Sequence, residues 1–444
     1  MRAILALSAA FVMGAAITSL PVTRTAFSQS AGNGMSLEDL QDVMEQVEST
    51  YVEDVPREQL IRSAIDGMVS DLDPHSDYLN PEEYQAMQVN TQGEYGGLGM
   101  RVTEQEDGFI EIIAPIEGTP AAASDIQAGD LIVGINGTPT QQLELGKAVE
   151  MMRGEPGTEI TITLRRDGEE PFQVTLEREN VTIEPVRTQA FQQIGYLRIT
   201  RFNKQAGSAV SNAIENLRSN KIDGEMRGLV IDLRNNPGGL LQQAIKVSDV
   251  FLDDKEVVSA RGRGGSVSKS YTTQPGRQVG DVPIVVLINA GSASASEIVA
   301  GALRDHDRAI IMGTRSFGKG SIQTVKPLES GGALRLTTAR YYTPSGDSIQ
   351  AQGIVPDIKV AQAEINRREA NRSLREQDLR GALEREGEGG GDSPQDSQPQ
   401  ASQADDGGGD GKGKGATERL AQDYQLNRAV TLLRGIALMN RQEG

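Results

Sequence analysis

Two short segments hold the residue types that acyl-transfer chemistry needs. The first reads Gly-Ser-Ala-Ser-Ala-Ser-Glu over residues 291–297 and follows an apolar run, 283–289, that predicts a buried strand. An apolar helical period comes next, and hydrolases use a strand–turn–helix to expose a serine where the following N–H can bind an oxyanion. Spacing alone leaves Ser292, Ser294 and Ser296 as candidate nucleophiles, and a serine-rich helix cap without chemistry would show the same pattern.

The base is harder to find, because the chain has only two histidines. His306 lies in a highly charged stretch and His75 in a turn rich in Pro and Asp, so both are typical of surface residues. Lys319 is the remaining candidate, between two glycines and beside Phe317 and Ile322. A lysine can act as a base where desolvation lowers its pKa, and apolar neighbours do that.

Gln323 follows Lys319 by four residues, which on a strand is the same face. Its amide could orient the lysine as the third member of a triad does. The segment 313–319 also fits a phosphate loop, G-x-x-x-x-G-K, but Gly320 replaces the required Ser or Thr and residues 321–325 predict a strand instead of a helix. We therefore expect no nucleotide, and the Ser–Lys chemistry requires no metal or other cofactor.

Composition excludes several other classes of protein. The 444 residues suggest about three domains. With 62 acidic and 44 basic residues, the net charge of −18 argues against a nucleic-acid partner. The absence of cysteine excludes disulfides, thiolate zinc sites and a cysteine nucleophile, and two histidines are too few for a His-rich metal centre.

The elements that would position these residues form an α/β multidomain chain. Residues 1–28 predict a signal peptide, with an uncleaved membrane anchor as the alternative, so the remainder lies beyond the inner membrane. Amphipathic periodicity predicts two N-terminal helices, broken near Val55-Pro56, with a capping box at Ser36. The expected segments are an N-terminal helical segment at 33–85, a domain of short strands at 86–180, a mixed α/β core at 181–362, a partly disordered linker at 363–415 and an amphipathic helix at 416–444.

The domain at 86–180 resembles a PDZ domain along its whole length. Strand patterns, the Gly129-Asp130 turn, an Asn136-Gly137 hairpin turn and a helical stretch at 143–152 occur in the expected order. In that fold the loop formed by Gly97, Leu98, Gly99 and Met100 turns N–H groups toward a peptide's C-terminal carboxylate, and the peptide adds as a strand beside residues 100–102.

Taken together, the motifs resemble those of the C-terminal processing, or tail-specific, serine proteases, which are periplasmic and thylakoid enzymes with a PDZ domain beside a Ser–Lys core. The resemblance covers nearly all of residues 36–360. The matching motifs are Asp71-Leu-Asp-Pro-His-Ser-Asp-Tyr, the PDZ segment, Leu233-Arg-Asn-Asn-Pro-Gly-Gly-Leu, the serine run, Phe317-Gly-Lys-Gly, Tyr341-Tyr-Thr-Pro-Ser-Gly and Gly353-Ile-Val-Pro-Asp.

The resemblance implies a role for each site residue. Ser294 would be the nucleophile, Lys319 the base and Gln323 the supporting amide. The oxyanion hole would be the Ala295 N–H with one N–H from the Pro237-Gly238-Gly239 turn, Gly238 being favoured and Gly239 the alternative. Arg153 matches a PDZ arginine implicated in aligning the catalytic lysine, although a cation at a helix C-terminus is also favoured by the dipole alone.

The same resemblance implies protein substrates presented by their C-terminal tails, with small apolar last residues, and a periplasmic location. It also suggests that the terminal helices mediate homo-oligomer formation or docking to a lipoprotein adaptor, whereas helices that only complete a core would carry the same pattern. The competing function is a non-catalytic PDZ scaffold with a decayed hydrolase core.

Overall fold

The computed structural model describes residues 35–105, 108–222, 224–265, 267–363 and 419–440. The expected signal or anchor segment and most of the expected linker lie outside these residues. The chain divides into two compact units, residues 1–68 and 69–444, which we describe separately. None of the described helices is long and apolar enough to cross a membrane.

The N-terminal unit consists of α1 (Leu37–Thr50) and most of α2 (Arg57–Ser70). The expected capping box is present, because the Ser36 N–H donates to Asp39 Oδ2 (2.6 Å) and the Asp39 N–H donates to Ser36 Oγ (3.2 Å). The break between the two helices falls at residues 51–56, as the sequence predicts. Several large apolar side chains of this unit are exposed: Met35, Leu37, Val43, Tyr51 and Val52.

The second unit begins with a turn that leads into β1 (Asp77–Leu79), α3 (Pro81–Gln92) and β2 (Glu94–Gly97). Asn80 caps α3, with Pro81 at its first position, and Gly93 ends the helix in the left-handed region (φ 77°). β2 pairs antiparallel with β9 (Glu179–Thr182). The chain therefore enters and leaves the region between these strands at one place, as an inserted domain does.

That inserted region is an antiparallel sheet in the order β3–β4–β5–β7–β8, with β6 paired to β5. Asn136 and Gly137 both have positive φ, 48° and 80°, and close the hairpin between β5 and β6. The bounds are β3 (Met100–Glu104), β4 (Ile110–Pro115), β5 (Leu131–Ile135), β6 (Thr138–Pro139), the short 3-10 helix η1 (Thr140–Gln142), α4 (Leu145–Met152), β7 (Glu159–Arg165) and β8 (Phe172–Glu177).

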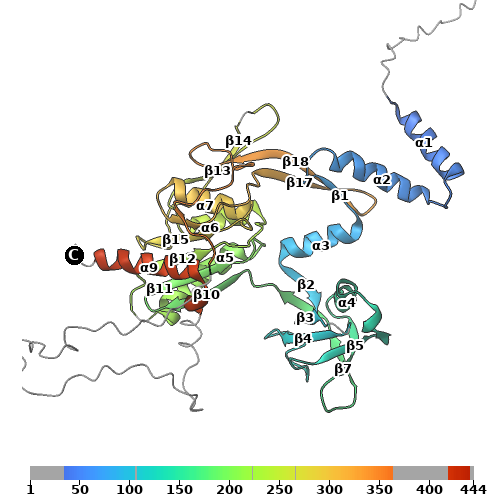
Figure 1. Ribbon diagram of the computed structural model, residues 1–444, viewed down its shortest axis with the longest axis horizontal. Coiled ribbons are helices and arrows are strands. Elements are labelled where there is room, and N and C mark those ends of the chain that lie inside the picture. Colours follow the sequence, from blue (N-terminus) through green and yellow to red (C-terminus); the bar gives the residue numbers. More distant parts are fainter. Residues whose placement is uncertain (1–34, 106–107, 223, 266, 364–418, 441–444) are drawn as a thin grey trace, which may run out of the picture. The chain divides into compact units, whose positions relative to one another are not determined.

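A six-stranded sheet in the order β10–β11–β12–β15–β16–β19 forms the centre of the α/β core (Figure 1). Its strands are parallel except for β10, which pairs antiparallel with β11 at one edge. The bounds are β10 (Val186–Phe191), β11 (Ile194–Ile199), β12 (Gly228–Asp232), β15 (Ile284–Ile288), β16 (Ile310–Gly313) and β19 (Ile358–Lys359).

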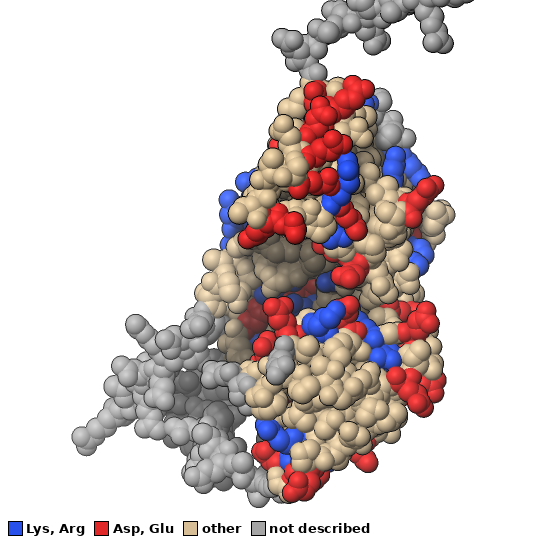
Figure 2. All heavy atoms as spheres, turned by 90° about the vertical axis from the view of Figure 1, so that its right-hand side faces the viewer, with Lys and Arg blue, Asp and Glu red and all other residues tan. Residues whose placement is uncertain are grey.

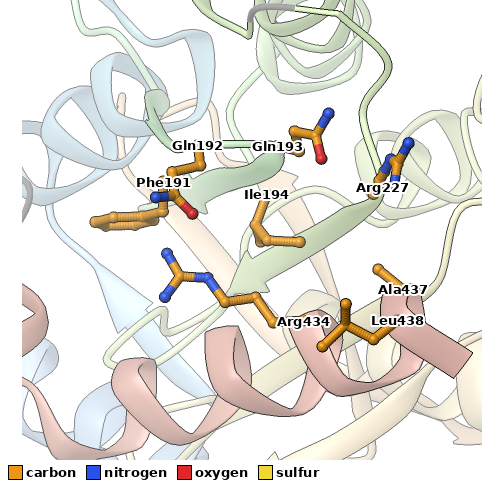
Figure 3. A pocket seen from close by; sticks show the side chains of 8 residues that line it. All are labelled: Phe191, Gln192, Gln193, Ile194, Arg227, Arg434, Ala437 and Leu438. Carbon is orange, nitrogen blue, oxygen red and sulfur yellow. The ribbon is translucent and has the colours of Figure 1, made fainter. Parts of the chain in front are cut away.

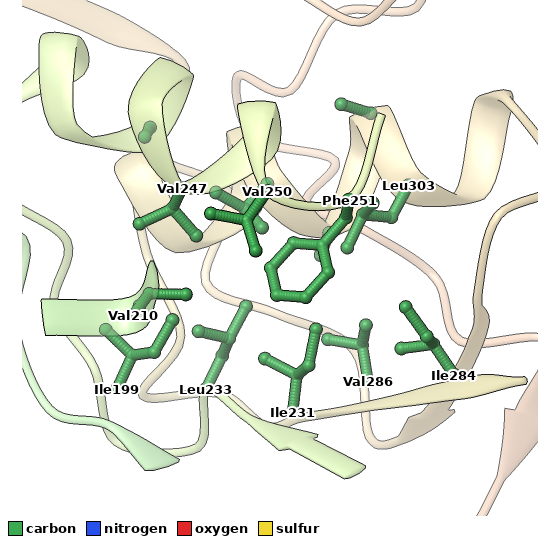
Figure 4. Close-up of a cluster of buried hydrophobic side chains, with 14 of the residues drawn as sticks. Ile199, Val210, Ile231, Leu233, Val247, Val250, Phe251, Ile284, Val286 and Leu303 are labelled. Atoms are coloured by element: carbon green, nitrogen blue, oxygen red, sulfur yellow. The ribbon is translucent and has the colours of Figure 1, made fainter. Parts of the chain in front are cut away.

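Helices cover both faces of this sheet, and every residue of its central strands β12 and β15 is buried. On one face α5 (Ala206–Asn216), α6 (Leu241–Asp249) and α7 (Ala295–Asp305) pack on Ile199, Ile231 and Val286 (Figure 4). A π-helical turn, η2 (Leu217–Lys221), follows α5. On the other face, α9 (Tyr424–Met439) packs Leu426, Val430 and Leu433 on Val230 and Val285. The C-terminal helix expected from the sequence therefore completes the core.

A second sheet, in the order β1–β18–β13–β14 with β17 also paired to β18, lies beside the core helices. Its bounds are β13 (Glu256–Arg261), β14 (Val267–Thr272), β17 (Ser321–Pro327) and β18 (Ala333–Tyr342).

Acidic and basic side chains are interspersed on the face of the molecule shown in Figure 2.

Candidate active site

A cleft of about 780 Å³ contains the residues that the sequence singles out. Ser294, Lys319 and Gln323 all line it, together with the turn 237–239 and apolar side chains that include Met87 and Ile322. A smaller pocket lies between the β10–β11 hairpin and the end of α9 (Figure 3). Its lining consists of apolar side chains, glutamines and two arginines, whereas the first cleft holds the serine and the lysine that the sequence singles out.

Ser294 occupies a strained turn between β15 and α7. Its φ of 55° and ψ of −113° lie outside the regions that a side chain favours, and such a conformation costs about 1–3 kcal/mol, stored where the surroundings enforce it. Ser294 is half-buried and lines the cleft, whereas Ser292 and Ser296 are fully buried. Their hydroxyls donate to the carbonyls of Leu233 (2.8 Å) and Asn236 (3.0 Å) respectively.

The buried carboxylate of Glu297 joins the serine turn to the lysine loop. Its Oε2 accepts from the N–H groups of Ser294 (2.8 Å) and Lys319 (2.9 Å). Its Oε1 accepts from Ser316 Oγ (2.6 Å) and the Gly318 N–H (2.7 Å). Sequence reasoning missed this residue, although Ser294 and Glu297 fit the S-x-x-E capping pattern that would have placed the carboxylate at the start of the helix.

Lys319 is half-buried and lies in the loop directly before β17. Burial lowers the pKa of its ammonium group and the charge of Arg335 lowers it further, while Asp73 and Asp77 oppose the shift. Phe317, which the sequence places beside the lysine, is 62% exposed and so does not supply the apolar setting expected of it. Ile322 does line the cleft.

The two histidines occupy very different places. His306 ends α7, twelve residues after Ser294, and at 1.5 Å per residue it lies about 18 Å away along the helix. Its Nε2 is 2.7 Å from the carbonyl of Glu256. Burial lowers the pKa of the His75 imidazole and the charge of Lys319 lowers it further, so His75 lies within electrostatic reach of the lysine.

Gln323 lies on β17, opposite Thr337 of β18. A register shift between Ile322 and Gln323 interrupts the strict alternation of the strand, and both Lys319 and Gln323 face the cleft. The Gln323 Nε2 donates to Ser321 Oγ (2.9 Å) and to Thr337 Oγ1 (3.3 Å). The amide oxygen is thereby left for another donor.

The turn 237–239 lies against the serine turn. A Cβ on Gly238 (φ 97°) would come within 2.7 Å of the Ala293 carbonyl and 2.9 Å of the Ala295 nitrogen, so only glycine fits there. The Gly238 N–H donates to Asn236 Oδ1 (2.9 Å). Among the described residues, no acceptor is found for the N–H groups of Gly239 and Ala295.

The C-terminal helix supports this turn from the other side of the sheet. Arg234, at the start of the turn segment, donates from Nη2 to Asp232 Oδ2 (2.7 Å) and Asp423 Oδ2 (2.6 Å). Its Nη1 donates to Gln425 Oε1 (3.0 Å). Residues 189 or more positions apart in the chain thus fix the backbone that leads into Pro237.

The expected tail-binding loop is shaped by its carbonyls. The Leu98 carbonyl accepts from the Ala121 N–H (2.9 Å), and the Gly99 carbonyl accepts from the Ile116 N–H (2.8 Å) and Thr119 Oγ1 (2.9 Å). Since C=O and N–H point in opposite directions across a trans peptide, the Gly99 and Met100 N–H groups point away from these contacts. β3, which starts at Met100, is an outer strand of its sheet.

Arg153 caps the C-terminus of α4 and its guanidinium lies over the ring of Tyr95, 4.8 Å from the centroid. Burial raises the pKa of the Tyr95 hydroxyl, and the charge of Arg153 opposes that shift. In this structure the arginine therefore has an aromatic partner on β2.

Comparison with known proteins agrees with this architecture. The family model described as "Peptidase family S41" matches residues 193–360, and one described as "PDZ domain" matches residues 87–165. A third, "Activating protease CtpB N-terminal domain", matches residues 13–83. A solved structure, of the photosystem II D1 C-terminal processing protease, is 31% identical, covers 74% of this chain and 88% of that chain, and has a TM-score of 0.45.

Two relatives are similar over most of their length. The carboxy-terminal-processing protease of Bartonella bacilliformis is 48% identical over 322 residues, which is 72% of this chain and 74% of the relative. The carboxyl-terminal-processing protease of Synechocystis is 38% identical over 312 residues, 68% of this chain and 72% of the relative. The resemblance drawn from the motifs is confirmed, and the chain belongs to the family of carboxy-terminal-processing proteases, serine peptidases that carry a PDZ domain.

Proposed function

We propose that Ser294 is the nucleophile and Lys319 the general base of this peptidase. One observation carries the assignment: Ser294 is the member of the serine run that reaches the cleft, and its backbone is fastened to that of Lys319 through Glu297. Ser292 and Ser296 use their hydroxyls as buried structural donors. The lowered pKa of Lys319 supports its role, because a base must be neutral for part of its time at working pH.

The reaction then follows from these groups. Neutral Lys319 Nζ takes the proton from Ser294 Oγ as Oγ bonds to the substrate carbonyl carbon. The resulting ammonium returns that proton to the leaving amine as the C–N bond breaks, which leaves an acyl-enzyme. Water then attacks the ester, again with Lys319 as the base, and the serine is regenerated.

The oxyanion would be bound by the Ala295 N–H and by one N–H from the turn 237–239. The sequence favours Gly238, but its N–H already donates to Asn236, whereas that of Gly239 has no acceptor among the described residues. We therefore regard Gly239 as the stronger second donor, with Gly238 available if the Asn236 contact breaks on binding. Each such donor contributes about 3–4 kcal/mol to the transition state in serine peptidases.

The PDZ domain would bind the C-terminal tail of the substrate. The Gly99 and Met100 N–H groups, with Gly97 and Leu98 completing the loop, suit a terminal carboxylate, and the outer strand β3 can pair with the last residues. Relatives are named for processing carboxy-termini, and we extend that substrate class to this chain. Small apolar last residues remain our expectation.

Location and partners rest on the sequence. We propose that residues 1–28 export the chain to the periplasm, as a cleaved signal or as an inner-membrane anchor. The exposed apolar side chains of α1 make the N-terminal unit the better candidate for an adaptor or a second copy. The apolar face of the C-terminal helix, in contrast, packs against the core sheet.

The test is cleavage of an unfolded reporter that carries an apolar C-terminal tail, with the products mapped by mass spectrometry. Cleavage by the wild type and by Ser292→Ala or Ser296→Ala variants that fold, but not by Ser294→Ala, would support the assignment. A folded wild-type chain that binds the tail and cleaves nothing would favour the scaffold function instead. Comparative C-terminal proteomics of envelope proteins would then identify natural substrates.

A further inference from the structure

A carboxylate outside the proposed Ser–Lys–Gln set, that of Asp73 in the turn before β1, is hydrogen-bonded to the strand residue that pairs with Gln323. The side chain of Asp73 closes its own turn, accepting from the His75 N–H (2.9 Å), the Ser76 N–H (3.2 Å) and Ser76 Oγ (2.6 Å). A further donor, Thr337 Oγ1 (3.1 Å), comes from 264 residues away on β18. The Thr337 N–H also donates to Ser76 Oγ (3.0 Å), so the turn and the strand are locked together.

Thr337 passes this constraint on to Gln323. An ionised Asp73 can accept but cannot donate, so the hydroxyl proton of Thr337 is committed to it. The hydroxyl oxygen can then only accept, and it accepts from Gln323 Nε2 (3.3 Å). Burial alone would raise the pKa of Asp73, but the hydrogen bonds from Ser76, His75 and Thr337 outweigh it and hold the pKa below the ordinary value, so the carboxylate stays ionised near neutral pH.

The hydrogen bonds from Gln323 to Thr337 and from Thr337 to Asp73 form a relay. This relay determines which way the Gln323 amide points. With Nε2 held by Thr337 and Ser321, Oε1 faces the other way. A neutral lysine amine has two N–H donors and one lone pair, and an acceptor for one N–H fixes the direction of the lone pair. We propose that Asp73 and Thr337 are positioning residues that orient the Gln323 amide oxygen toward Lys319. This inference rests on the catalytic roles proposed above for Lys319 and Gln323.

Asp73 also acts on Lys319 through its charge. The groups whose charges bear on the lysine are Arg335, Asp73 and Asp77, and the lysine in turn bears on His75. Asp73 raises the pKa of Lys319 against the effects of burial and Arg335. Its two effects can be separated, since Thr337→Val removes the hydroxyl relay and leaves the charge, while Asp73→Asn changes both.

The experiment measures kcat, KM and the pH profile of reporter cleavage for five variants of the full chain, normalised to the fraction of enzyme that a serine-reactive phosphonate titrates. Thr337→Val should lower kcat at least tenfold with little change in KM, a part of the 10²–10⁴-fold that a positioned general base supplies. Thr337→Ser, which keeps the hydroxyl, should recover most of that loss. Gln323→Ala should lower kcat by at least as much as Thr337→Val.

The matched control is Thr338→Val, on the neighbouring exposed position of β18, where the hydroxyl pairs with Thr324 Oγ1 (2.8 Å). It should leave kcat unchanged. Asp73→Asn should lower kcat and also move the rising limb of the pH profile to lower pH, because the charge that raises the pKa of Lys319 is gone. Thr337→Val should leave that limb in place.

Wild-type kcat in a folded Thr337→Val variant would overturn the relay. So would an equal loss in Thr337→Ser and Thr337→Val, because a packing defect would cause both. Lys319→Ala, measured beside these variants, separates this inference from the proposed function. An active Lys319→Ala would contradict the catalytic assignment itself, whereas an inactive one with a fully active Thr337→Val contradicts the relay alone.

Discussion

The backbone amides of Ser294 and Lys319 donate to the same oxygen, Oε2 of the buried Glu297, at 2.8 and 2.9 Å. The two residues come from separate elements, the start of α7 and the loop before β17. A fixed backbone at both positions limits the relative movement of the hydroxyl and the amine. Glu297 thus restrains the separation on which the proposed proton transfer from Ser294 to Lys319 would depend.

Replacing this carboxylate should damage both catalysis and stability. In Glu297→Gln one oxygen becomes an NH₂ group, which cannot accept, so two of the four donors lose their acceptor. We expect unfolding in urea to cost about 1–3 kcal/mol less for each buried donor left unsatisfied. We also expect kcat to fall at least a hundredfold per titratable serine, since a misplaced base loses most of the 10²–10⁴-fold it supplies. Normal kcat in a destabilised variant would make Glu297 a purely structural residue.

The charge of Arg335 should set the pH at which the enzyme becomes active. With Lys319 as the proposed base, activity should rise with pH through the pKa of the lysine, which burial and Arg335 lower. Arg335→Gln removes a cation and frees Asp77, its partner at 2.6 Å, and both changes raise that pKa. The rising limb of the kcat profile should therefore move to higher pH. A limb that stays in place, or moves lower, would show that Lys319 is not the group that titrates.

Arg153 should couple tail binding to catalysis. In this structure its guanidinium lies over Tyr95, and we expect a bound tail to release it toward Lys319, the proposed base. Arg153→Ala should bind a tail peptide with normal affinity and fail to cleave the reporter. Tyr95→Leu, which removes a cation–π contact worth about 0.5–2 kcal/mol, should raise basal cleavage without a tail peptide. If both variants cleave like the wild type with and without a non-cleavable tail, the PDZ domain is a passive tether.

The pairing of Asp423 with Arg234 should make the C-terminal helix dependent on pH. Burial alone would raise the pKa of Asp423, but the hydrogen bonds from Arg234 outweigh it and hold the pKa below its ordinary value. A depressed carboxyl pKa means that the stabilisation is present above the unfolded pKa and is lost as the pH falls through the folded one. Asp423→Asn should lower the free energy of unfolding by about 1–3 kcal/mol at pH 7 and much less at pH 3.

The comparison at the two pH values is the control for this prediction. A difference between the wild type and Asp423→Asn that stays constant with pH would assign the loss to packing. The turn 237–239 should also be affected, so we expect kcat to fall with KM nearly unchanged.

Local patterns account for what the sequence predicted well. The strand–turn–helix around Ser294 and the Asn136-Gly137 hairpin can be predicted from residues that are close in sequence. Apolar periodicity and the positions of glycines determine such elements without any contact to a distant residue. The contacts that hold the site do not have that property. Asp73 meets Thr337 across 264 residues and Arg234 meets Asp423 across 189, and nothing local in the sequence pairs them.

Adjacency in sequence also misled at one position. Its position in the sequence predicts that Phe317 desolvates Lys319, yet the phenylalanine is 62% exposed and the lysine is half-buried by other residues. The fall in the lysine pKa was expected for the right reason, burial, but from the wrong neighbour. The sequence alone does not distinguish the buried Glu297 from a glutamate that caps the start of a helix in solvent.

The most direct test of the account is to locate the adduct of a serine-reactive phosphonate in the active enzyme and to follow it in base variants. We expect modification of Ser294 and no modification or cleavage in Ser294→Ala. Cleavage should also be lost in Lys319→Ala and in Lys319→Arg, whose guanidinium cannot act as a base near neutral pH. His75→Ala and His306→Ala should remain active. An adduct on Ser292 or Ser296, or an inactive but folded His75→Ala or His306→Ala beside an active Lys319→Ala, would contradict it.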